Sequence, residues 1–225
     1  MENYIRLQRT GYGNADITRC FMKDIQKDLI SIRPHLPKFC NRILDIGCGI
    51  GGIDLYLYNH FKGLCQLHML DYNKTSESVY YGYKPEGAAY NSLDFTMEFL
   101  KINGVNESQI ALYNAGMNEF PSCETAADDD CLLCHGQGEY WEGNFIKLVK
   151  CECACNVKFD IIISLLSCGF HYPVETYLDK IKAAKSGIVI LDIRKNSGGL
   201  ELLKNNFSSV EVIADYEKCE RVLIR

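Results

Sequence analysis

The sequence has no hydrophobic run long enough to cross a membrane. Its longest nearly apolar segment, residues 161–170, is interrupted by serines and a cysteine. It reaches only about half of the roughly 20 residues that a membrane-spanning helix needs. The first residues, MENYIRLQRT, contain no apolar stretch after their charges, so we expect no secretory signal. These absences predict a cytoplasmic or nuclear protein without membrane association, in which thiols stay reduced.

An excess of positive charge is also missing. The 24 Lys and Arg residues are outnumbered by 29 Asp and Glu, and the formal net charge is −5. This balance excludes an overall basic field for a long nucleic acid, although a local basic patch is still compatible with it. A hydrophobic content of 47% excludes wholesale disorder. A chain of 225 residues is too short for two full enzyme domains, so we treat residues 1–225 as a single domain.

Strand-like and helix-like segments alternate along the chain, and no internal repeat is present. The expected strands are residues 42–46, 66–70, 109–113, 159–164 and 187–192. The expected helices are residues 16–30, 51–61, 92–102, 174–184 and 198–205, with Asp16 and Ser92 as caps. The alternation predicts an α/β fold with a Rossmann-like, doubly wound, mostly parallel sheet. Segments 210–214 and 221–224 are joined by a short turn, so they must pair antiparallel at the C-terminal end of the fold.

A glycine-rich turn follows the first expected strand, in the sequence ILDIGCGIGG at residues 43–52. Glycine lets the chain turn sharply and lets a ligand approach the backbone without an intervening Cβ. The free N–H groups at the start of the next helix can then bind that ligand. The spacing fits both G-x-G-x-G and G-x-G-x-x-G, so the glycines alone do not choose between ligands.

Two acids narrow the choice. Asp45 lies at the end of the first strand, where its carboxylate could meet a cationic group directly or through water. Asp71 ends the second strand and is placed to accept hydrogen bonds from ribose hydroxyls. Asp45 would repel a pyrophosphate, because both groups are negatively charged. It would attract a ligand that carries an ammonium and a sulfonium group.

On these residues, on the strand FDIIIS and on the antiparallel closing segments, the chain resembles the class I S-adenosylmethionine-dependent methyltransferases. The resemblance covers most of the chain. It implies that Gly47 and Gly49 line the methionine part of the cofactor, that Asp71 binds the ribose, and that Tyr72 packs near the adenine. Asn114 and Ala115 would meet the adenine edge, where the family often has Asp in place of Asn. The expected S-adenosylmethionine site is Asp45, Gly47, Cys48, Gly49, Asp71, Tyr72, Asn114, Ala115 and Ser164. The alternatives are a glycine turn that only packs a helix on a sheet, and a nicotinamide dehydrogenase, for which no separate substrate domain remains.

The loop after the fourth strand should flank the reactive methyl group, because ligands bind beyond the carboxyl ends of parallel strands. His171 is the histidine of this loop, and a neutral imidazole could accept the proton of an attacking hydroxyl. Alternatively, His171 caps the next helix or packs against Tyr172. The stretch GFHYP followed by ETYLD looks like a loop of small-molecule and sugar O-methyltransferases. The Asn-Pro-Pro-Tyr motif of amino-methylating DNA enzymes is absent, and Cys168 is interpreted as a packing residue.

Residues 118–157 fit none of the expected elements and are interpreted as an insertion between the third and fourth strands. It contains Cys131, Cys134, Cys151, Cys153 and Cys155. The C-x₂-C pair and the later group resemble a zinc knuckle or ribbon, with Cys131, Cys134, Cys151 and either Cys153 or Cys155 as ligands and His135 as a weaker candidate. Four thiolates leave no open position, so this zinc would be structural. The alternative is a set of unligated thiols; the C-x₃-C-x₂-C spacing of radical enzymes is absent.

The combined prediction is an enzyme that moves the methyl group of S-adenosylmethionine to a hydroxyl of a small molecule or glycan. A nucleic-acid or protein acceptor, with the insertion as the docking element, is the second interpretation, since Lys147, Lys150 and Lys158 lie near the cysteines. The third is a non-catalytic, zinc-containing interaction protein. An arm at residues 12–14 could close over the cofactor, or it could be a solvated tail. The acceptor and the oligomeric state are left open.

Overall fold

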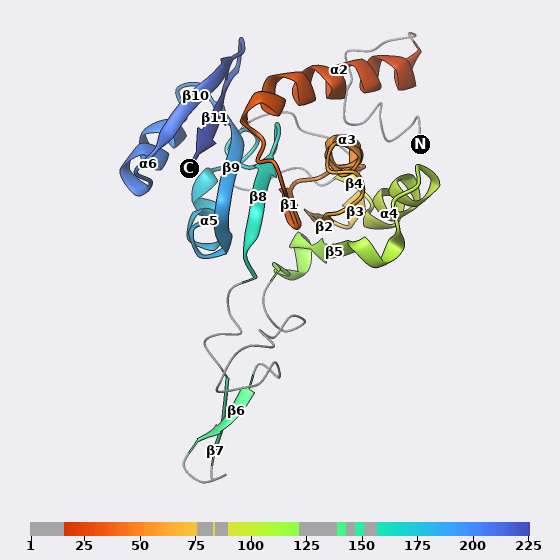
Figure 1. Cartoon of the computed structure of the whole chain (residues 1–225). Coiled ribbons are helices and arrows are strands. Elements are labelled where there is room, and N and C mark those ends of the chain that lie inside the picture. Colours follow the sequence, from red (N-terminus) through yellow and green to blue (C-terminus); the bar gives the residue numbers. More distant parts are fainter. Residues whose placement is uncertain (1–15, 76–82, 84–89, 122–138, 143–146, 151–156) are drawn as a thin grey trace.

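A seven-stranded sheet forms the centre of the protein (Figure 1). The computed structural model describes residues 16–75, 83, 90–121, 139–142, 147–150 and 157–225. In these ranges the strands of the sheet follow the order β10-β11-β9-β8-β1-β2-β5. They are β1 (Arg42–Ile46), β2 (Gln66–Asp71), β5 (Ile110–Asn114), β8 (Phe159–Ser164), β9 (Lys185–Arg194), β10 (Val210–Asp215) and β11 (Cys219–Ile224). All neighbours pair in parallel except β11, which runs antiparallel to both β9 and β10. The predicted doubly wound, mostly parallel sheet is therefore confirmed.

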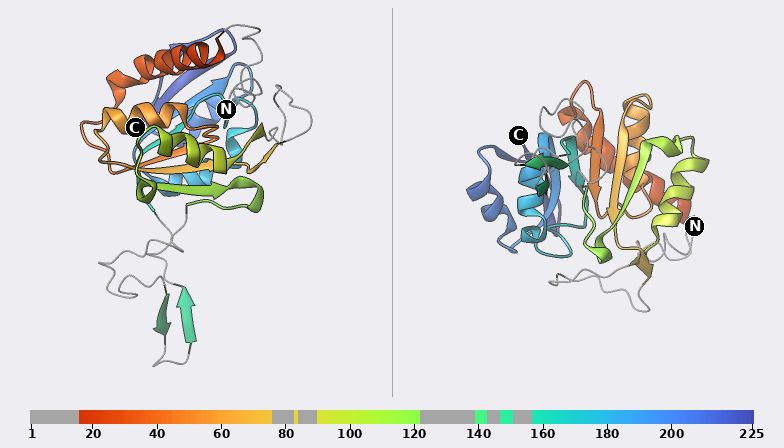
Figure 2. Two further views of the ribbon diagram at one scale, coloured as in Figure 1. Left: turned by 90° about the vertical axis from the view of Figure 1, so that its right-hand side faces the viewer. Right: turned by 90° about the horizontal axis from the view of Figure 1, so that it is seen from below.

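Helices cover both faces of the sheet (Figures 1 and 2). The first face carries α2 (Ile17–Ile32), α3 (Gly52–His60) and α4 (Leu93–Ile102), and the second carries α5 (Leu178–Ala184) and α6 (Gly199–Asn206). Successive strand residues point to opposite faces, so Ile43 of β1 joins the first core and Leu44 joins the second. Covering on both faces explains why the strands are apolar at consecutive positions.

The N-termini of α2 and α4 are held by different kinds of hydrogen bond. Asp16 caps α2 as predicted, because its carboxylate accepts the N–H of Arg19 at 3.1 Å. Ser92 occupies the N-cap position of α4, but its hydroxyl makes no capping hydrogen bond, so its predicted side-chain cap is wrong. The N–H of Leu93, the first residue of α4, donates to the side-chain oxygen of Asn73 at 3.0 Å. A residue just beyond β2 therefore holds the start of this helix.

The helix expected over residues 174–184 is shorter than predicted. A single 3₁₀ turn, η6 (Val174–Thr176), comes first, and α5 begins only at Leu178. Tyr177 lies between them with φ −123° and ψ 4°, which is outside the helical region. The following strand β9 begins at Lys185 and is longer than the expected residues 187–192.

Two small antiparallel pairs lie outside the main sheet. Residues 72–90, which matched no expected element, contribute β3 (Lys74–Thr75) and β4 (Tyr90–Asn91). Strands β6 (Glu139–Glu142) and β7 (Lys147–Lys150) pair with each other and fall between β5 and β8 in the sequence, inside the expected insertion. The five cysteines of the zinc prediction, with His135 and the arm at residues 12–14, lie outside the described residues. The zinc site is therefore still a prediction.

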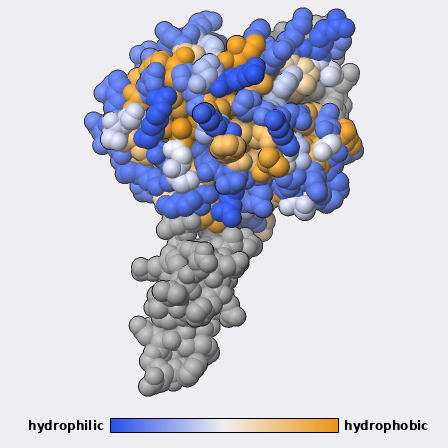
Figure 3. Space-filling view, in the orientation of Figure 1, coloured by the Kyte–Doolittle hydropathy of each residue, from blue (hydrophilic) through white to orange (hydrophobic). Residues whose placement is uncertain are grey.

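The surface mixes polar and apolar side chains. On the face shown in Figure 3, hydrophobic residues lie in patches separated by hydrophilic ones. The most exposed large hydrophobic residues come from different parts of the chain, with Phe39, Leu64 and Met117 among them. Single exposed apolar side chains of this kind are normal. None of the helices in the described ranges combines the length and apolarity needed to cross a lipid bilayer.

Candidate functional site

A cavity lies at the carboxyl ends of β1, β2 and β8. From the predicted cofactor site and its neighbouring loop, the structure brings together Asp45, Gly47, Cys48, Gly49, Asp71, Tyr72, Ala115 and His171. Helix α2 forms another wall through Phe21, Ile25 and Asp28. None of the described residues that line this cavity is a lysine or an arginine. The cavity is therefore acidic and partly apolar.

The glycine turn between β1 and α3 depends on positive φ angles. Gly47, Gly49 and Gly51 have φ values of 81°, 55° and 80°. Residues other than glycine adopt such positive φ angles only with strain. A Cβ on Gly47 would lie 1.8 Å from the hydroxyl oxygen of Ser167. The N–H of Gly47 donates to the carbonyl of Leu70 at 2.7 Å, which ties the turn to the end of β2. Glycine at position 47 is thus required by both the backbone and its neighbour.

Asp71 organises the turn as well as facing the cavity. One carboxylate oxygen accepts the N–H of Gly49 at 2.8 Å, and the other accepts the N–H of Tyr72 at 2.7 Å. Burial raises the pKa of Asp71 to about 6, against the opposing effect of these hydrogen bonds. Asn91 and Thr96, both buried, each donate to the carbonyl of Gly49 at 2.7 Å. The N–H and the carbonyl of Gly49 are therefore both held by side chains.

Asp45 is a buried acid with one carboxylate oxygen that receives no hydrogen bond from the described residues. It is 3% exposed, it lines the cavity, and no described donor reaches its Oδ1 atom. Burial, and then the neighbouring charge of Asp54, raise the pKa of Asp45 well above its usual range. A buried acceptor without a donor is costly. A cationic or hydrogen-bond-donating ligand in the cavity would relieve that cost.

The loop after β8 forms another wall of the cavity, and its Ser167 lies directly against Gly47. The backbone N–H of His171 donates to the carbonyl of Ser167 at 2.8 Å, and its ring packs edge-on against Phe170 with centroids 4.9 Å apart. The next element, η6, has Pro173 at its N-cap and no side-chain cap. The alternative in which His171 caps that helix is therefore wrong. Its imidazole lines the cavity instead.

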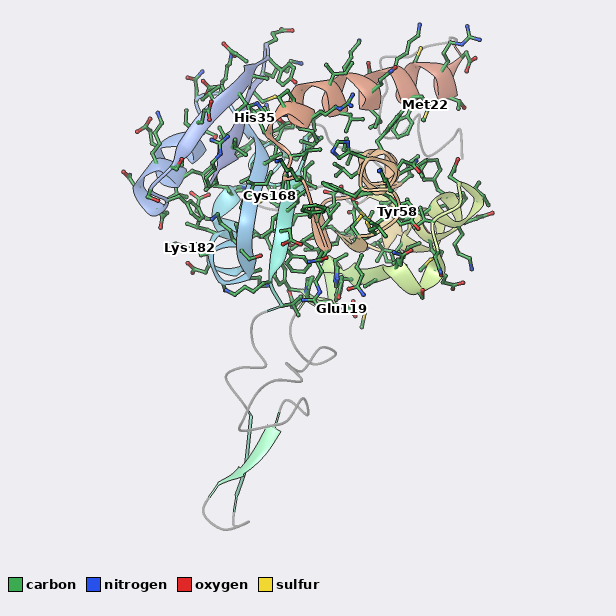
Figure 4. All side chains as sticks on the ribbon, viewed as in Figure 1. Met22, His35, Tyr58, Glu119, Cys168 and Lys182 are labelled. Atoms are coloured by element: carbon green, nitrogen blue, oxygen red, sulfur yellow. The ribbon has the colours of Figure 1, made fainter. Side chains whose placement is uncertain are left out.

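Cys168 of this loop lies in the interior of the protein (Figure 4). It is fully buried in the second core, and burial raises the pKa of its thiol. A thiol held in its neutral form cannot act as a nucleophile. Its contacts agree with the interpretation of Cys168 as a packing residue.

Two residues of the predicted cofactor site do not line the cavity. The side-chain oxygen of Asn114 accepts the N–H groups of Gly116 and Asn73 at 3.0 and 3.3 Å. The hydroxyl of Ser164 is fully buried, donates to the carbonyl of Ile46 at 2.5 Å and accepts the N–H of Cys168 at 2.9 Å. Through these contacts, the side chains of Asn114 and Ser164 hold the neighbouring backbone in place.

A buried arginine connects two walls of the cavity. Arg221 of β11 is 1% exposed and binds both carboxylate oxygens of Asp192 at 2.7 and 2.8 Å. It also binds Asp28 of α2 at 3.0 Å. Asp192 in turn accepts the N–H of Leu166, whose φ is 55°, at 3.2 Å. One guanidinium group thus joins helix α2 to the loop that carries His171.

Several of these residues were missed by the sequence analysis. They are Asp54, Asn91, Thr96, Ser167 and Arg221, and all except Asp54 come from segments far along the chain from the residues that they contact. Only Asp54 left a usable signal, since it is an acid in the first turn of the helix behind the glycine turn. In the described ranges, no three or more His, Cys, Asp or Glu residues are grouped so that they could hold a metal ion.

Comparison with known proteins places this geometry in a familiar fold. No protein-family profile matches the sequence, and no curated protein matches it. Among solved structures, a candidate O-methyltransferase of Nostoc punctiforme PCC 73102 is 12% identical with a TM-score of 0.54; 98% of this chain and 59% of that chain are covered. The pyocyanin biosynthetic protein PhzM is 16% identical with a TM-score of 0.52, and the match covers 100% of this chain and 61% of that chain. This chain thus spans about three fifths of the length of both. It has the class I methyltransferase fold, as its sequence predicted.

Proposed function

We propose that this chain, with its class I methyltransferase fold, transfers the methyl group of S-adenosylmethionine to a hydroxyl group of a small molecule or glycan. The observation that carries the proposal is the pairing of two acids, Asp45 and Asp71, at neighbouring strand ends around a glycine turn with positive φ angles. This arrangement suits a ligand that carries a ribose and a cationic amino-acid part. We place the reaction in the cytoplasm.

The residues present fit that cofactor. Asp45 has an unpartnered buried oxygen for the ammonium group, and Asp71 faces the cavity with a carboxylate for the ribose hydroxyls. The backbone of Gly47 and Gly49 is open to the methionine part because neither residue has a Cβ. Tyr72 and Ala115 lie in the cavity wall, as expected of residues that pack against the adenine. When bound, S-adenosylmethionine supplies an activated methyl group, so the protein needs only to align the acceptor and exclude water.

His171 is our candidate for the general base. Its imidazole belongs to the loop after β8 and lines the same cavity as the two acids. A neutral imidazole there can take the proton of an acceptor hydroxyl. The lack of lysine and arginine among the described lining residues favours an uncharged acceptor over a nucleic-acid phosphate backbone.

Calorimetry with S-adenosylhomocysteine tests the cofactor site without knowledge of the acceptor. We expect Asp71→Asn to weaken binding about 10- to 100-fold, the effect of losing hydrogen bonds to a charged group. Asp160→Asn is the matched control, because Asp160 also accepts two backbone N–H groups, from Asn41 and Arg42, at the amino ends of β1 and β8, away from the cavity. Absence of binding by the unmodified protein would refute the proposal.

We propose separately that residues 118–157 form an insertion that holds one structural zinc ion through Cys131, Cys134, Cys151 and Cys153 or Cys155. Thiolate pairs at this spacing are typical of structural zinc sites. Elemental analysis of protein purified without chelator should find about one zinc per chain. A zinc-free, fully folded protein would remove this proposal and leave the cofactor site unaffected.

A further inference from the structure

Asp54 places a second buried carboxyl group beside Asp45. Asp54 is the third residue of α3, directly behind the glycine turn, and it is 0% exposed. A side-chain hydrogen bond between the two acids raises the pKa of Asp45 and lowers the pKa of Asp54, so the two carboxyl groups are neighbours. If both were ionised, the described part of the chain would offer no donor to either oxygen of Asp54 or to Oδ1 of Asp45. The pair can satisfy itself only when one of the two carboxyl groups carries a proton.

The surroundings of the pair make that proton hard to lose. The neighbouring charge that acts on the pair is that of Asp71 at the end of β2, which raises the pKa of Asp45. The thiols of Cys48 and Cys65 lie close enough for the carboxylates to raise their own pKa values, so both thiols stay neutral. Helix α2 contributes the acid Asp28 to the same cavity, where Asp28 is paired with Arg221. Arg221 itself does not line the cavity, and no other described lysine or arginine does. His171 is a further lining residue.

Burial reinforces the effect of these neighbours. It is the largest cause that raises the pKa of Asp45, and also the largest that raises the pKa of Asp54. Two adjacent carboxyl groups in such a site titrate as a unit, and the first proton leaves well before the second.

We propose that Asp54 is a positioning residue for the amino group of the cofactor: in the empty site Asp45 and Asp54 share one proton, and the ammonium group takes its place. This inference rests on the proposed function, since it requires a ligand with an amino-acid part. The charges balance. The free pair carries one negative charge, while the complex carries two carboxylates and one ammonium, and one proton passes to the solvent. Asp45 then contacts the ammonium, and Asp54 acts through Asp45.

The exchange predicts that cofactor affinity increases with pH. Because the free protein holds a proton that the complex lacks, lowering the pH favours the free protein. The association constant should rise up to tenfold for each pH unit over the range in which the free pair is protonated. A site whose carboxylates are already ionised would not show this dependence.

The test is a count of released protons by calorimetry at pH 6.5 in buffers of different ionisation enthalpy. At this pH an α-amino group, with a pKa of about 7.7–8.0, keeps its own proton. S-adenosylhomocysteine is compared with 5′-methylthioadenosine, which has the same ribose and adenine but no amino-acid part. If Asp71 releases a proton when the ribose binds, it does so with both ligands, so this proton cancels in the difference between them. We expect about one more proton released with S-adenosylhomocysteine.

Two variants assign this proton. In Asp54→Asn, the side-chain amide can donate to Asp45, so Asp45 is already ionised in the free protein and the extra proton release should disappear. Asp94→Asn is the control, since Asp94 also lies in the first turn of a helix, on the surface, and it should keep the extra release. If Asp54→Asn does not fold, the comparison of the two ligands on the unmodified protein decides alone.

The outcomes separate this inference from the proposed function. Equal proton release with both ligands would overturn the inference and leave cofactor binding intact. Retention of the extra release by Asp54→Asn would also overturn it. Failure of both ligands to bind would overturn the proposed function and, with it, this inference.

Discussion

Replacement of Gly47 by alanine should damage both the stability of the protein and its cofactor site. The new Cβ would lie 1.8 Å from the hydroxyl oxygen and 2.3 Å from the Cβ of Ser167, so the loop after β8 would have to move. Holding alanine at a φ of 81° costs about 1–2 kcal/mol. Overpacking against the loop adds about 1–3 kcal/mol. We therefore expect a total loss of about 2–5 kcal/mol in the free energy of unfolding, together with loss of S-adenosylhomocysteine binding.

Denaturant titration and calorimetry check this expectation, and the chain provides a matched control. Gly198 also has a φ of 81°, but nothing lies within 4 Å of its added Cβ. Gly198→Ala should therefore show only the backbone cost and leave binding unchanged. Adding Ser167→Gly to Gly47→Ala leaves the nearest Ser167 atom, its Cα, at 3.8 Å, so the overpacking loss should be recovered relative to Ser167→Gly alone. Equal losses for Gly47→Ala and Gly198→Ala would refute the proposed clash.

The other predictions concern the buried arginine, the buried acids and the candidate base. Arg221→Met should cost about 3–5 kcal/mol in urea titration, since it leaves the fully buried carboxylate of Asp192 and the partly buried carboxylate of Asp28 without their cation. Arg225→Met, which removes an exposed ion pair, should cost under about 1 kcal/mol. Similar losses of stability in the two variants would contradict the structural role of Arg221. Because burial raises the pKa of Asp71 to about 6, above its unfolded value of about 3.9, ionisation disfavours the folded state. The Tm of the ligand-free protein should thus fall as the pH rises from 4 to 7, and Asp71→Asn should make this fall smaller. A Tm of the unmodified protein that does not change with pH would contradict the raised pKa of Asp71. His171→Ala should cut turnover on a hydroxyl acceptor about 10²- to 10⁴-fold with unchanged affinity for S-adenosylhomocysteine, and equal loss of both would indicate a structural role.

The sheet could be predicted because its signals are local. The expected segments 42–46 and 159–164 match β1 and β8 residue for residue. The short turn before residue 219 dictated the antiparallel pairing that the structure confirms. Local signals did not reveal the contacts of distant residues. Ser92 has the chemistry of a cap, but its hydroxyl makes no capping hydrogen bond, and the first N–H of the helix, that of Leu93, donates to the side chain of Asn73.

The candidate site shows the same division. Asp45 and Asp71 could be found because they end strands next to a glycine turn, and parallel strands bring their carboxyl ends to one edge. Asn91 and Thr96 could not be found, since nothing in their own segment indicates that they bind the carbonyl of Gly49. Arg221 resembles any charged residue of a closing strand until the fold buries it between two acids.

The order of the strands has a consequence for how the protein is made. In the chain β11 follows β10, but in the sheet β11 lies between β9 and β10 and is the strand that bonds to both. A ribosome that has released only residues up to Asp215 has therefore produced a strand that cannot yet dock. Until Cys219–Ile224 emerge, β9 has an open edge, and such edges attract foreign strands. Nascent chains paused at that point should need chaperone protection more than chains in which β11 has emerged.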